Sequence, residues 1–404
     1  MEKLLRGDQI FTEVGVVENG YVLISDKNIK KIGLNDDDGT EEYEEIIIPD
    51  SYILPGFIDL HIHGFLDIDV TECNVSDLER LSFELSKHGV VGFLPSLISA
   101  SSDVIIEQVN KIRSIVGTKD GGARILGVHL EGPWLHYERR GAHPQQWVRN
   151  PEKSEVKKII RETKDIVKSV TFSPEIENAV WLTEVLSHAG IVPIMGHTNA
   201  TYEQAQRVIL AGARHVTHMF NAMLGFRENK NELGTIEPGI EAAIFNHDSV
   251  TVELIPSPTF VSYPLIELVW KLKGPDKVIL VTDAGRGTGF PEGYVMEFQD
   301  GRKAAVRKDA LRLIEDGPLH NALLGNIHTL NVGIKNLARH LNIPLYTALK
   351  TVSLNPARVL GLQKSHGSLM PGKRADIVVT DRELNILMTI IHGEIVYRSA
   401  KSKD

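Results

Sequence analysis

The stretch that decides the fold runs from residue 55 to residue 63 and reads Pro55-Gly56-Phe57-Ile58-Asp59-Leu60-His61-Ile62-His63. Apolar residues dominate it and glycine or proline bounds it, a pattern typical of a buried strand, here one that ends in two histidines. Successive side chains of a strand point to opposite faces, so His61 and His63 share a face and could hold one metal ion. An isolated His-x-His is more often a core histidine beside a solvated one, so the metal hypothesis depends on the rest of the chain.

From Gly56 onward, apolar segments alternate with amphipathic ones. The apolar segments fit strands at 56–63, 90–98, 125–130, 169–172, 191–195, 215–218, 249–255 and 277–282. Between them, Ser76 with Glu79 and Thr201 with Gln204 have the spacing of helix capping boxes. Repeated strand–helix units with strands apolar on both faces predict a (β/α)8 TIM-like barrel, which we assign to residues 53–360. The polar stretch 285–318 is expected to form a hairpin or loop over the barrel mouth.

Both ends of the chain are rich in short β-like segments, at 21–25 and 45–48 near one end and at 375–379 and 395–397 near the other. Turn residues separate these segments, and the acidic run at 35–39 is typical of a solvated loop. We expect residues 1–52 and 361–404 to form one small β-sandwich from both termini, with the barrel inserted between its two parts.

The composition excludes several classes of protein. The chain has 404 residues, of which 42% are hydrophobic, as in ordinary soluble domains. Its 53 acidic residues outnumber the 44 basic ones, which argues against a nucleic-acid partner. The single cysteine, Cys73, excludes a disulfide framework and favours a reducing compartment. We find no signal-peptide core and no apolar run of about 18 residues, so we expect a cytoplasmic protein with no membrane partner.

The ends of the predicted strands carry the chemistry. Barrel enzymes place their working side chains at the C-terminal ends of the strands. Five of these ends here bear an imidazole or a carboxylate, namely His61 with His63, Glu131, His197, His218 and Asp283. Taken singly, each is more often a solvated polar residue than a ligand, but a ring of them is hard to obtain by chance. Such nitrogen and oxygen donors suit Zn²⁺, or Fe²⁺, Mn²⁺ or Co²⁺.

Motifs spread over nearly the whole chain carry a family resemblance. They are residues 55–63, His129-Leu130-Glu131-Gly132-Pro133, Gly196-His197-Thr198-Asn199-Ala200, His215-Val216-Thr217-His218-Met219-Phe220-Asn221-Ala222-Met223, Val281-Thr282-Asp283-Ala284, and Gly367-Ser368-Leu369-Met370-Pro371-Gly372-Lys373-Arg374-Ala375-Asp376. Together they resemble the N-acetylglucosamine-6-phosphate deacetylases of the amidohydrolase superfamily. The His-x-His and the tail motif alone would indicate only the superfamily.

The resemblance implies a role for each matched residue. Glu131, His197 and His218 would hold the principal divalent metal, with zinc as the first choice. His61 and His63 would complete a second site, because members of the family bind one or two ions. Asp283 would be the general base that accepts a proton from the attacking water and returns it to the leaving amine.

The resemblance also implies a site for the rest of the substrate. His143 would contact the substrate amide and polarise its carbonyl group. Asn221, Ala222 and Arg227 would hold the sugar phosphate, and in the family the arginine reaches in from a neighbouring subunit. We therefore expect a homodimer that acts on a small amino-sugar phosphate. A planar guanidinium suits this task because it pairs with two phosphate oxygens at once.

Three stretches depart from the family pattern. An Asp-Gly-x-His segment usually follows the seventh strand, but residues 256–260 here read Pro256-Ser257-Pro258-Thr259-Phe260. Phe260 thus occupies the place of an imidazole that reaches the sugar. The loop at 229–232 is longer, residues 323–326 replace a Leu-Ala-Gly-Ser pattern, and Arg286 stands where small or apolar residues are usual. The metal and base residues are intact, whereas the sugar-recognition shell is altered.

These departures leave alternatives open. The main hypothesis is hydrolysis of N-acetylglucosamine 6-phosphate to glucosamine 6-phosphate and acetate, in amino-sugar catabolism. The altered shell could instead favour a related N-acyl amino sugar, such as the galactosamine epimer. Another amidohydrolase reaction, such as opening of a cyclic amide, is a further alternative. The last alternative is not an enzyme but a sugar-phosphate sensor that binds without catalysis. The retained Asp283 argues against it.

Overall fold

A barrel of parallel strands forms the centre of the molecule in the computed structural model, which describes residues 2–34, 43–116, 121–228, 234–298, 301–314 and 320–400. Hydrogen bonding gives the strand order β6-β9-β11-β12-β13-β14-β17-β18. The barrel strands are β6 (Phe57–Ile62), β9 (Val90–Leu97), β11 (Val128–Glu131), β12 (Val167–Phe172), β13 (Val192–Met195), β14 (His215–Val216), β17 (Thr251–Leu254) and β18 (Val278–Leu280). Between β18 and β6 the contact is a single parallel bridge, Ile62 with Ala284, so the barrel is nearly closed. The short β10 (Arg124–Ile125) extends the sheet beside β9.

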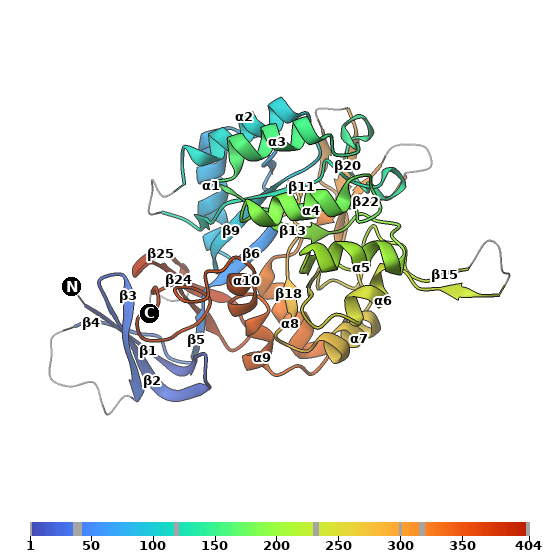
Figure 1. Cartoon of the computed structure of the whole chain (residues 1–404). Helices are drawn as coiled ribbons and strands as arrows, with labels where there is room; N and C mark the ends of the chain where they lie inside the picture. Colours follow the sequence, from blue (N-terminus) through green and yellow to red (C-terminus); the bar gives the residue numbers. More distant parts are fainter. Residues whose placement is uncertain are drawn as a thin grey trace.

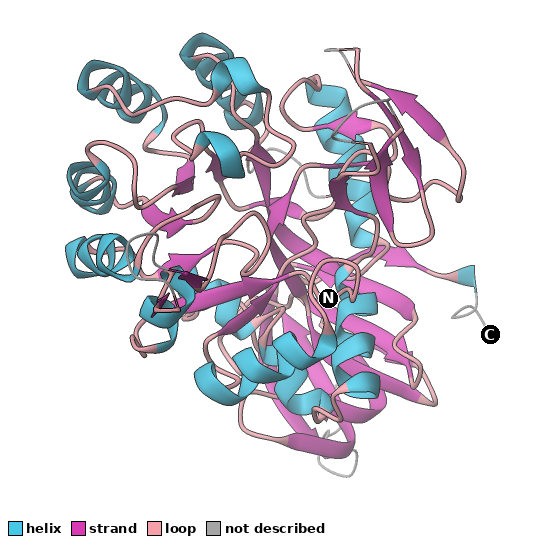
Figure 2. Cartoon of the chain, turned by 90° about the vertical axis from the view of Figure 1, so that its right-hand side faces the viewer, coloured by secondary structure: helices cyan, strands magenta, loops and turns pink. Residues whose placement is uncertain are grey.

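Helices surround these strands (Figure 2). They are α1 (Val75–Ser86), α2 (Ser102–Arg113), α3 (Lys153–Thr163), α4 (Ala179–His188), α5 (Tyr202–Ala211), α6 (Ile240–Phe245), α7 (Tyr263–Lys273), α8 (Leu330–His340), α9 (Leu345–Lys350) and α10 (Leu354–Val359). Their apolar faces and the outer faces of the strands make one large buried cluster. The predicted (β/α)8 barrel is therefore confirmed.

One of the two predicted capping boxes is confirmed and the other is wrong. Thr201 and Gln204 cap α5 as expected, each side chain bonding to the other residue's backbone N–H. At α1 the box consists of Asn74 and Asp77, two residues before the predicted pair. Asparagine is as good an N-cap as serine, so the chain offers two overlapping boxes and the helix begins at the earlier one.

The two chain ends meet in one sheet, seen as blue and red strands side by side in Figure 1. Its strand order is β25-β24-β23-β5-β1-β2-β3, with β4 beside β1. The strands are β1 (Lys3–Phe11), β2 (Val16–Ser25), β3 (Asn28–Leu34), β4 (Glu44–Ile47), β5 (Ser51–Pro55), β23 (Ile377–Asp381), β24 (Ile386–Ile391) and β25 (Glu394–Arg398). They enclose a separate apolar core, so the predicted β-sandwich-like domain is confirmed. The divisions at residues 52/53 and 360/361 remain predictions, and the run at 35–39 lies outside the described residues.

The expected hairpin or loop after the eighth barrel strand is an antiparallel sheet. Its strands are β19 (Val295–Glu297), β20 (Lys303–Val306), β21 (Ala310–Leu313) and β22 (Leu323–Asn326). Asn326 joins this sheet to the barrel, because its backbone N–H donates to Asp283 O at 3.1 Å and its Nδ2 donates to Thr282 O at 2.9 Å. We call this sheet the roof. Two small pairs complete the strands, β7 (Gly64–Phe65) with β8 (Ile68–Asp69) and β15 (Arg227–Glu228) with β16 (Ile236–Glu237).

We predict that the barrel core depends on the fully buried ring of Phe93 on β9. Phe93→Ala should lower the free energy of unfolding by about 3–5 kcal/mol, because it removes apolar burial and leaves a cavity. Phe83→Ala on α1, where the side chain is 40% exposed, is the matched control and should cost about 0.5 kcal/mol or less. Urea unfolding followed by circular dichroism measures both. Equal losses would contradict this assignment of the core.

Candidate active site

Glu131 is the centre of the polar cluster at the C-terminal ends of the barrel strands. Its Oε1 lies 2.9 Å from His197 Nε2, 2.9 Å from His218 Nε2 and 3.5 Å from His61 Nε2. Its Oε2 lies 3.0 Å from His143 Nε2 and 3.2 Å from His63 Nε2. Burial would raise the pKa of Glu131, but the surrounding imidazoles lower it well below its usual value. Imidazoles from the ends of β6, β13 and β14 and from the loop after β11 thus surround one buried carboxylate.

Asp283 lies at the edge of this cluster, directly after β18. Its Oδ1 is 3.2 Å from His63 Nε2 and 3.7 Å from His61 Nε2. Burial would raise the pKa of Asp283, but the imidazoles of His63, His61 and His218 lower it, so the group is a carboxylate at neutral pH. His197 and Asp283 both have a φ of 48°, a left-handed conformation that is uncommon for residues other than glycine and that clusters at active sites.

The hydrogen bonds of the imidazole Nδ1 atoms show which nitrogens are free to bind a metal. His63 Nδ1 lies 2.8 Å from Ser96 O, and His197 Nδ1 lies 2.7 Å from Arg139 O. A carbonyl oxygen only accepts, so both Nδ1 atoms carry a proton, and Nε2 is the nitrogen of each ring that faces the cluster and would bind an ion once its own proton is lost. His218 Nε2 faces the same point, and its Nδ1 has no partner among the described residues.

His143 has the opposite arrangement. Its Nδ1 accepts a hydrogen bond from the backbone N–H of Ser99 at 3.0 Å, so its Nε2 carries the proton and donates to Glu131. Burial, which outweighs the attraction of the Glu131 carboxylate, lowers the pKa of His143 to about 4. This imidazole is therefore neutral and a hydrogen-bond donor, and it is a poor metal ligand although it lies beside Glu131 and His197.

The donor set fits a divalent metal ion. His61, His63 and Asp283 offer ligand atoms within 4.8 Å of one another, as do Glu131 and His197. Imidazole nitrogens and carboxylate oxygens without thiolates suit Zn²⁺, Fe²⁺, Mn²⁺ and Co²⁺. Cys73 is buried against Gln108, and burial raises the pKa of its thiol to about 12, so it takes no part in this cluster.

A cavity of about 660 Å³ opens above the cluster. The barrel side of its lining is polar and includes Glu131, His143, His197, His218 and Asp283. The roof side is largely apolar and includes Phe298, Leu311, Leu313, Leu323 and Leu324. Its size is that of a small-molecule site. A substrate in it would have the reacting group against the barrel and its remaining atoms against the roof and the loops.

The predicted phosphate-binding residues divide between two cavities. Asn221 and Ala222 line the cavity above the cluster. Arg227 does not, because it lines a separate cavity and its Nη2 donates to Asn199 O at 2.5 Å and Ala200 O at 3.0 Å. Arg227 therefore lies outside the substrate cavity of its own chain.

Three of the four departures from the family pattern line the cavity above the cluster, namely Phe260, Arg286 and the stretch that begins at Leu323. Phe260 packs beside Asn221, whose Nδ2 donates to Phe260 O at 3.1 Å. Arg286 pairs with Asp67 through Nε at 3.0 Å and Nη2 at 2.5 Å, and its guanidinium lies over Phe298. The longer loop at 229–232 lies outside the described residues.

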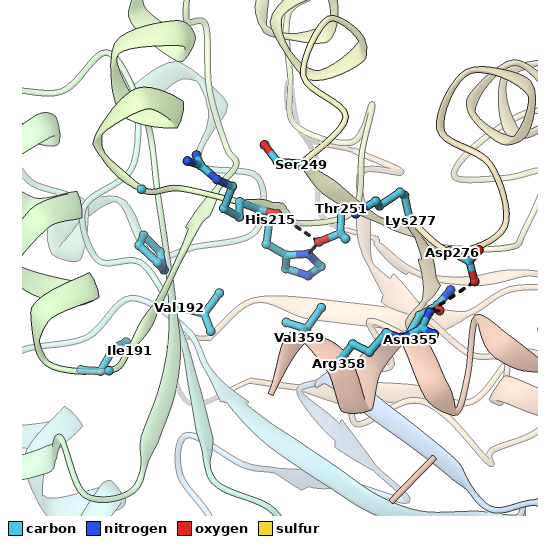
Figure 3. Close-up of a pocket in the computed structure, with 14 residues that line it drawn as sticks. Ile191, Val192, His215, Ser249, Thr251, Asp276, Lys277, Asn355, Arg358 and Val359 are labelled. Carbon is cyan, nitrogen blue, oxygen red and sulfur yellow. Dashed lines mark hydrogen bonds and ion pairs between the residues drawn. The ribbon is translucent and has the colours of Figure 1, made fainter. Parts of the chain in front are cut away.

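A second cavity, of about 450 Å³, lies at the opposite end of the barrel (Figure 3). Its lining comes from the beginnings of β13, β14, β17 and β18 and from α10, and includes His215 and Thr251. In (β/α)8 barrels this end serves stability and the other end serves catalysis. The site residues predicted from the strand ends all lie at the catalytic end.

Comparison with known proteins agrees with this geometry. Residues 52–396 match the amidohydrolase family. The chain is 33% identical to N-acetylglucosamine-6-phosphate deacetylase of Bacillus subtilis, over 99% of this chain and 98% of that protein. It is 27% identical to N-acetylgalactosamine-6-phosphate deacetylase of Escherichia coli O157:H7, over 98% and 99%. The crystal structure of N-acetylglucosamine-6-phosphate deacetylase from Pasteurella multocida superposes with a TM-score of 0.88 at 26% identity, over 99% of this chain and 100% of that one.

The chain therefore belongs to the amidohydrolase family and is a hydrolase that acts on an amide carbon–nitrogen bond. Within that family, its similarity over the full length is to the amino-sugar-phosphate deacetylases. Among the described residues, no helix is both long and apolar enough to cross a membrane.

The proton positions predict which histidines hold metal. His218→Gln should weaken binding of the principal ion at least about 100-fold, because it removes one of the proposed ligands. Losing only a group that hydrogen-bonds to a ligand already costs 10–100-fold in metal affinity. His143→Gln should leave the metal content close to that of the unmodified protein, because Nε2 of His143 carries a proton. Equilibrium dialysis followed by elemental analysis measures both. Loss of metal in the His143 variant would overturn the assigned proton positions.

Proposed function

We propose that this chain removes the acetyl group from N-acetylglucosamine 6-phosphate, giving glucosamine 6-phosphate and acetate in amino-sugar catabolism. The observation that carries the proposal is Asp283 beside the Glu131-centred imidazole cluster, 3.2 Å from His63, in a chain that is similar over its whole length to deacetylases of this substrate. We place the protein in the cytoplasm, because its single cysteine, Cys73, is buried and cannot form a disulfide framework, as is usual in a reducing compartment.

The ions would bind at the Nε2 atoms and carboxylates of the cluster. Glu131, His197 and His218 would hold the principal divalent ion, with zinc as the first choice and iron, manganese or cobalt as alternatives. His61 and His63 would hold a second ion. A bound ion supplies Lewis acidity, which makes the amide carbonyl a better electrophile and water a stronger acid.

Two proton transfers and one hydrogen bond fall to side chains of the chain itself. Asp283, kept ionised by its imidazole neighbours, accepts a proton from the attacking water as the new carbon–oxygen bond forms. The neutral His143 donates its Nε2–H to the carbonyl oxygen, where negative charge develops. Asp283 then gives the proton to the amine nitrogen as the carbon–nitrogen bond breaks. One carboxylate thus serves both halves of the hydrolysis.

The phosphate end of the substrate would require a second copy of the chain. Asn221 and Ala222 line the substrate cavity, whereas Arg227 lies outside it. Arg227 begins β15, which projects away from the barrel with β16 (Figure 1). Phe226 and Ile236 on this hairpin are 67% and 62% exposed, so the hairpin offers apolar side chains that a second copy could cover. A homodimer in which each hairpin reaches the partner's cavity would account for both observations.

Phe260 favours a second candidate substrate, N-acetylgalactosamine 6-phosphate. A phenyl ring cannot make the hydrogen bond of an imidazole, so discrimination between sugar epimers at this wall would be weaker. The similarity to a deacetylase of that epimer supports the same alternative.

The proposal predicts acetate release from N-acetylglucosamine 6-phosphate by the zinc-loaded protein. The galactosamine epimer and the unphosphorylated sugar are assayed beside it. Asp283→Asn should lower kcat at least about 100-fold while the substrate still binds, because it removes the base. Turnover of the epimer alone would shift the assignment to the second candidate. The sensor hypothesis would be favoured if the protein turned over none of the three sugars. It would be favoured further if Asp283→Asn then bound the phosphorylated sugar as tightly as the unmodified protein.

The hairpin hypothesis predicts that Arg227→Ala raises KM for the phosphorylated sugar about 10-fold or more, since a guanidinium–phosphate pair is lost. Arg207→Ala, an exposed arginine on α5, is the matched control. Mixing Arg227→Ala subunits with Asp283→Asn subunits should restore a low KM, because one cavity of each mixed dimer then has both groups. An unrestored KM, or a monomer in sedimentation, would overturn the intersubunit assignment.

A further inference from the structure

Glu253, on β17, is a carboxylate inside the barrel that the proposed mechanism does not use. Its side chain is almost fully buried, and a buried carboxylate is costly unless it is paired. Burial would raise the pKa of Glu253, but His215 and His61 lower it well below its usual value. The carboxylate lies within the core, below the metal-ligand cluster, and all its partners are side chains or backbone N–H groups of the barrel.

Glu253 contacts both halves of that cluster. Its Oε2 accepts a hydrogen bond from Thr217 Oγ1 at 2.9 Å and lies 3.3 Å from His61 Nδ1. The same oxygen accepts from the backbone N–H of His218 at 3.4 Å. One carboxylate thus faces a ligand of each proposed ion.

The hydrogen-bond directions around Thr217 fix the proton of His61. A hydroxyl group has a single proton, and Thr217 donates it to Glu253. The oxygen of Thr217 can then only accept from His61 Nδ1, 3.0 Å away. His61 therefore carries a proton on Nδ1 and turns Nε2, its only nitrogen available to an ion, toward the cluster, where it lies 3.0 Å from His63 Nε2. Without an acceptor at position 253, Thr217 could donate to His61 Nδ1 and produce the tautomer that cannot bind a metal.

His215 holds Glu253 from the other side. Its Nε2 lies 2.9 Å from Glu253 Oε1, and its Nδ1 lies 2.7 Å from Thr251 Oγ1, the contact drawn in Figure 3. Thr251 donates its own proton to Arg214 O at 3.0 Å, so it accepts from His215. Both nitrogens of His215 thus face oxygen atoms, and the ring holds Glu253 in place from the side opposite His61.

We infer that Glu253 is a positioning residue of the metal site, which through Thr217 holds His61 in the tautomer that binds an ion. The inference rests on the proposed metal-dependent function. The inference concerns metal affinity, whereas the deacetylase assignment concerns turnover. Either one can therefore fail in its own experiment while the other stands. Carboxylates behind ligating histidines have this orienting role in metal sites generally, and their loss costs 10–100-fold in metal affinity.

Metal titration of the whole protein tests the inference. Co²⁺ is added to metal-free protein, and the bound ions are counted by elemental analysis and followed by their visible absorption. The unmodified protein should bind two ions per chain. The double variant Glu253→Leu with His215→Phe removes the buried pair together, and the ion at His61 and His63 should then bind 10–100-fold more weakly. The ion at Glu131, His197 and His218 should retain its affinity to within about threefold.

Two matched variants separate positioning from packing. Glu253→Gln keeps an acceptor oxygen for Thr217 and should restore both affinities to within about threefold of the unmodified protein. Thr217→Val lets His61 Nδ1 donate directly to Glu253, so it too should retain the second ion. If Glu253 only supported the packing of the barrel, its replacement would lower the affinity of both metal sites by similar factors.

The milder Glu253→Asp keeps the charge that faces His215 but withdraws the acceptor from Thr217, so it serves if the double variant does not fold. It should weaken the second ion about 10-fold. Unchanged affinity for the second ion in either the double variant or Glu253→Asp, or a single bound ion in the unmodified protein, would overturn the inference.

Discussion

The carboxylate of Glu131 is the constraint on which the site depends. It is buried at the end of β11 with five imidazoles around it, so its charge must be balanced by those groups or by a cation they hold. Those imidazoles can converge only because the strands that carry them are parallel and end at one mouth. Two further features bring the side chains together. The barrel nearly closes at the bridge between Ile62 and Ala284, and the backbone of His197 and Asp283 is left-handed.

The strand-end part of the candidate site could be predicted to converge because Glu131, His197, His218 and Asp283 follow apolar runs, whereas His143 lies in a polar loop. The end of an apolar strand is visible in a sequence, and parallel strands of a barrel place such ends together. Even so, the sequence could not distinguish the roles of the imidazoles. His143 and His197 both lie against Glu131, yet one accepts a backbone N–H at Nδ1 and the other donates to a carbonyl oxygen. That difference arises from the loops around them, which no spacing rule describes.

Other features left no readable signal. Glu253 lies on a strand whose neighbours Val252 and Leu254 are also buried, so no alternation of polar and apolar residues marks the face it occupies. The roof strands are short and separated by polar turns, and the sequence pattern therefore predicted only a hairpin or loop. The capping box of α1 began earlier than expected because Asn74 competes with Ser76 as an N-cap. Contacts between segments distant in sequence decided the outcome at Glu253 and in the roof, whereas at α1 two overlapping local signals competed.

Two of the departures from the family pattern, Phe260 and Arg286, lie in loops, whereas Asn326 of the altered stretch 323–326 donates its backbone N–H to Asp283 O at 3.1 Å. Glu131, His197, His218 and Asp283 extend from barrel strands, whose positions are fixed by hydrogen bonds to both neighbours. Phe260 and Arg286 belong to loops and to the margin of the roof, where a substitution disturbs no barrel strand. The residues proposed for the chemistry thus extend mainly from barrel strands, and Phe260 and Arg286 extend from loops, so a change in these loops need not move the proposed catalytic residues. Amide hydrolysis can therefore be retained while the wall that contacts the sugar is rebuilt around Phe260.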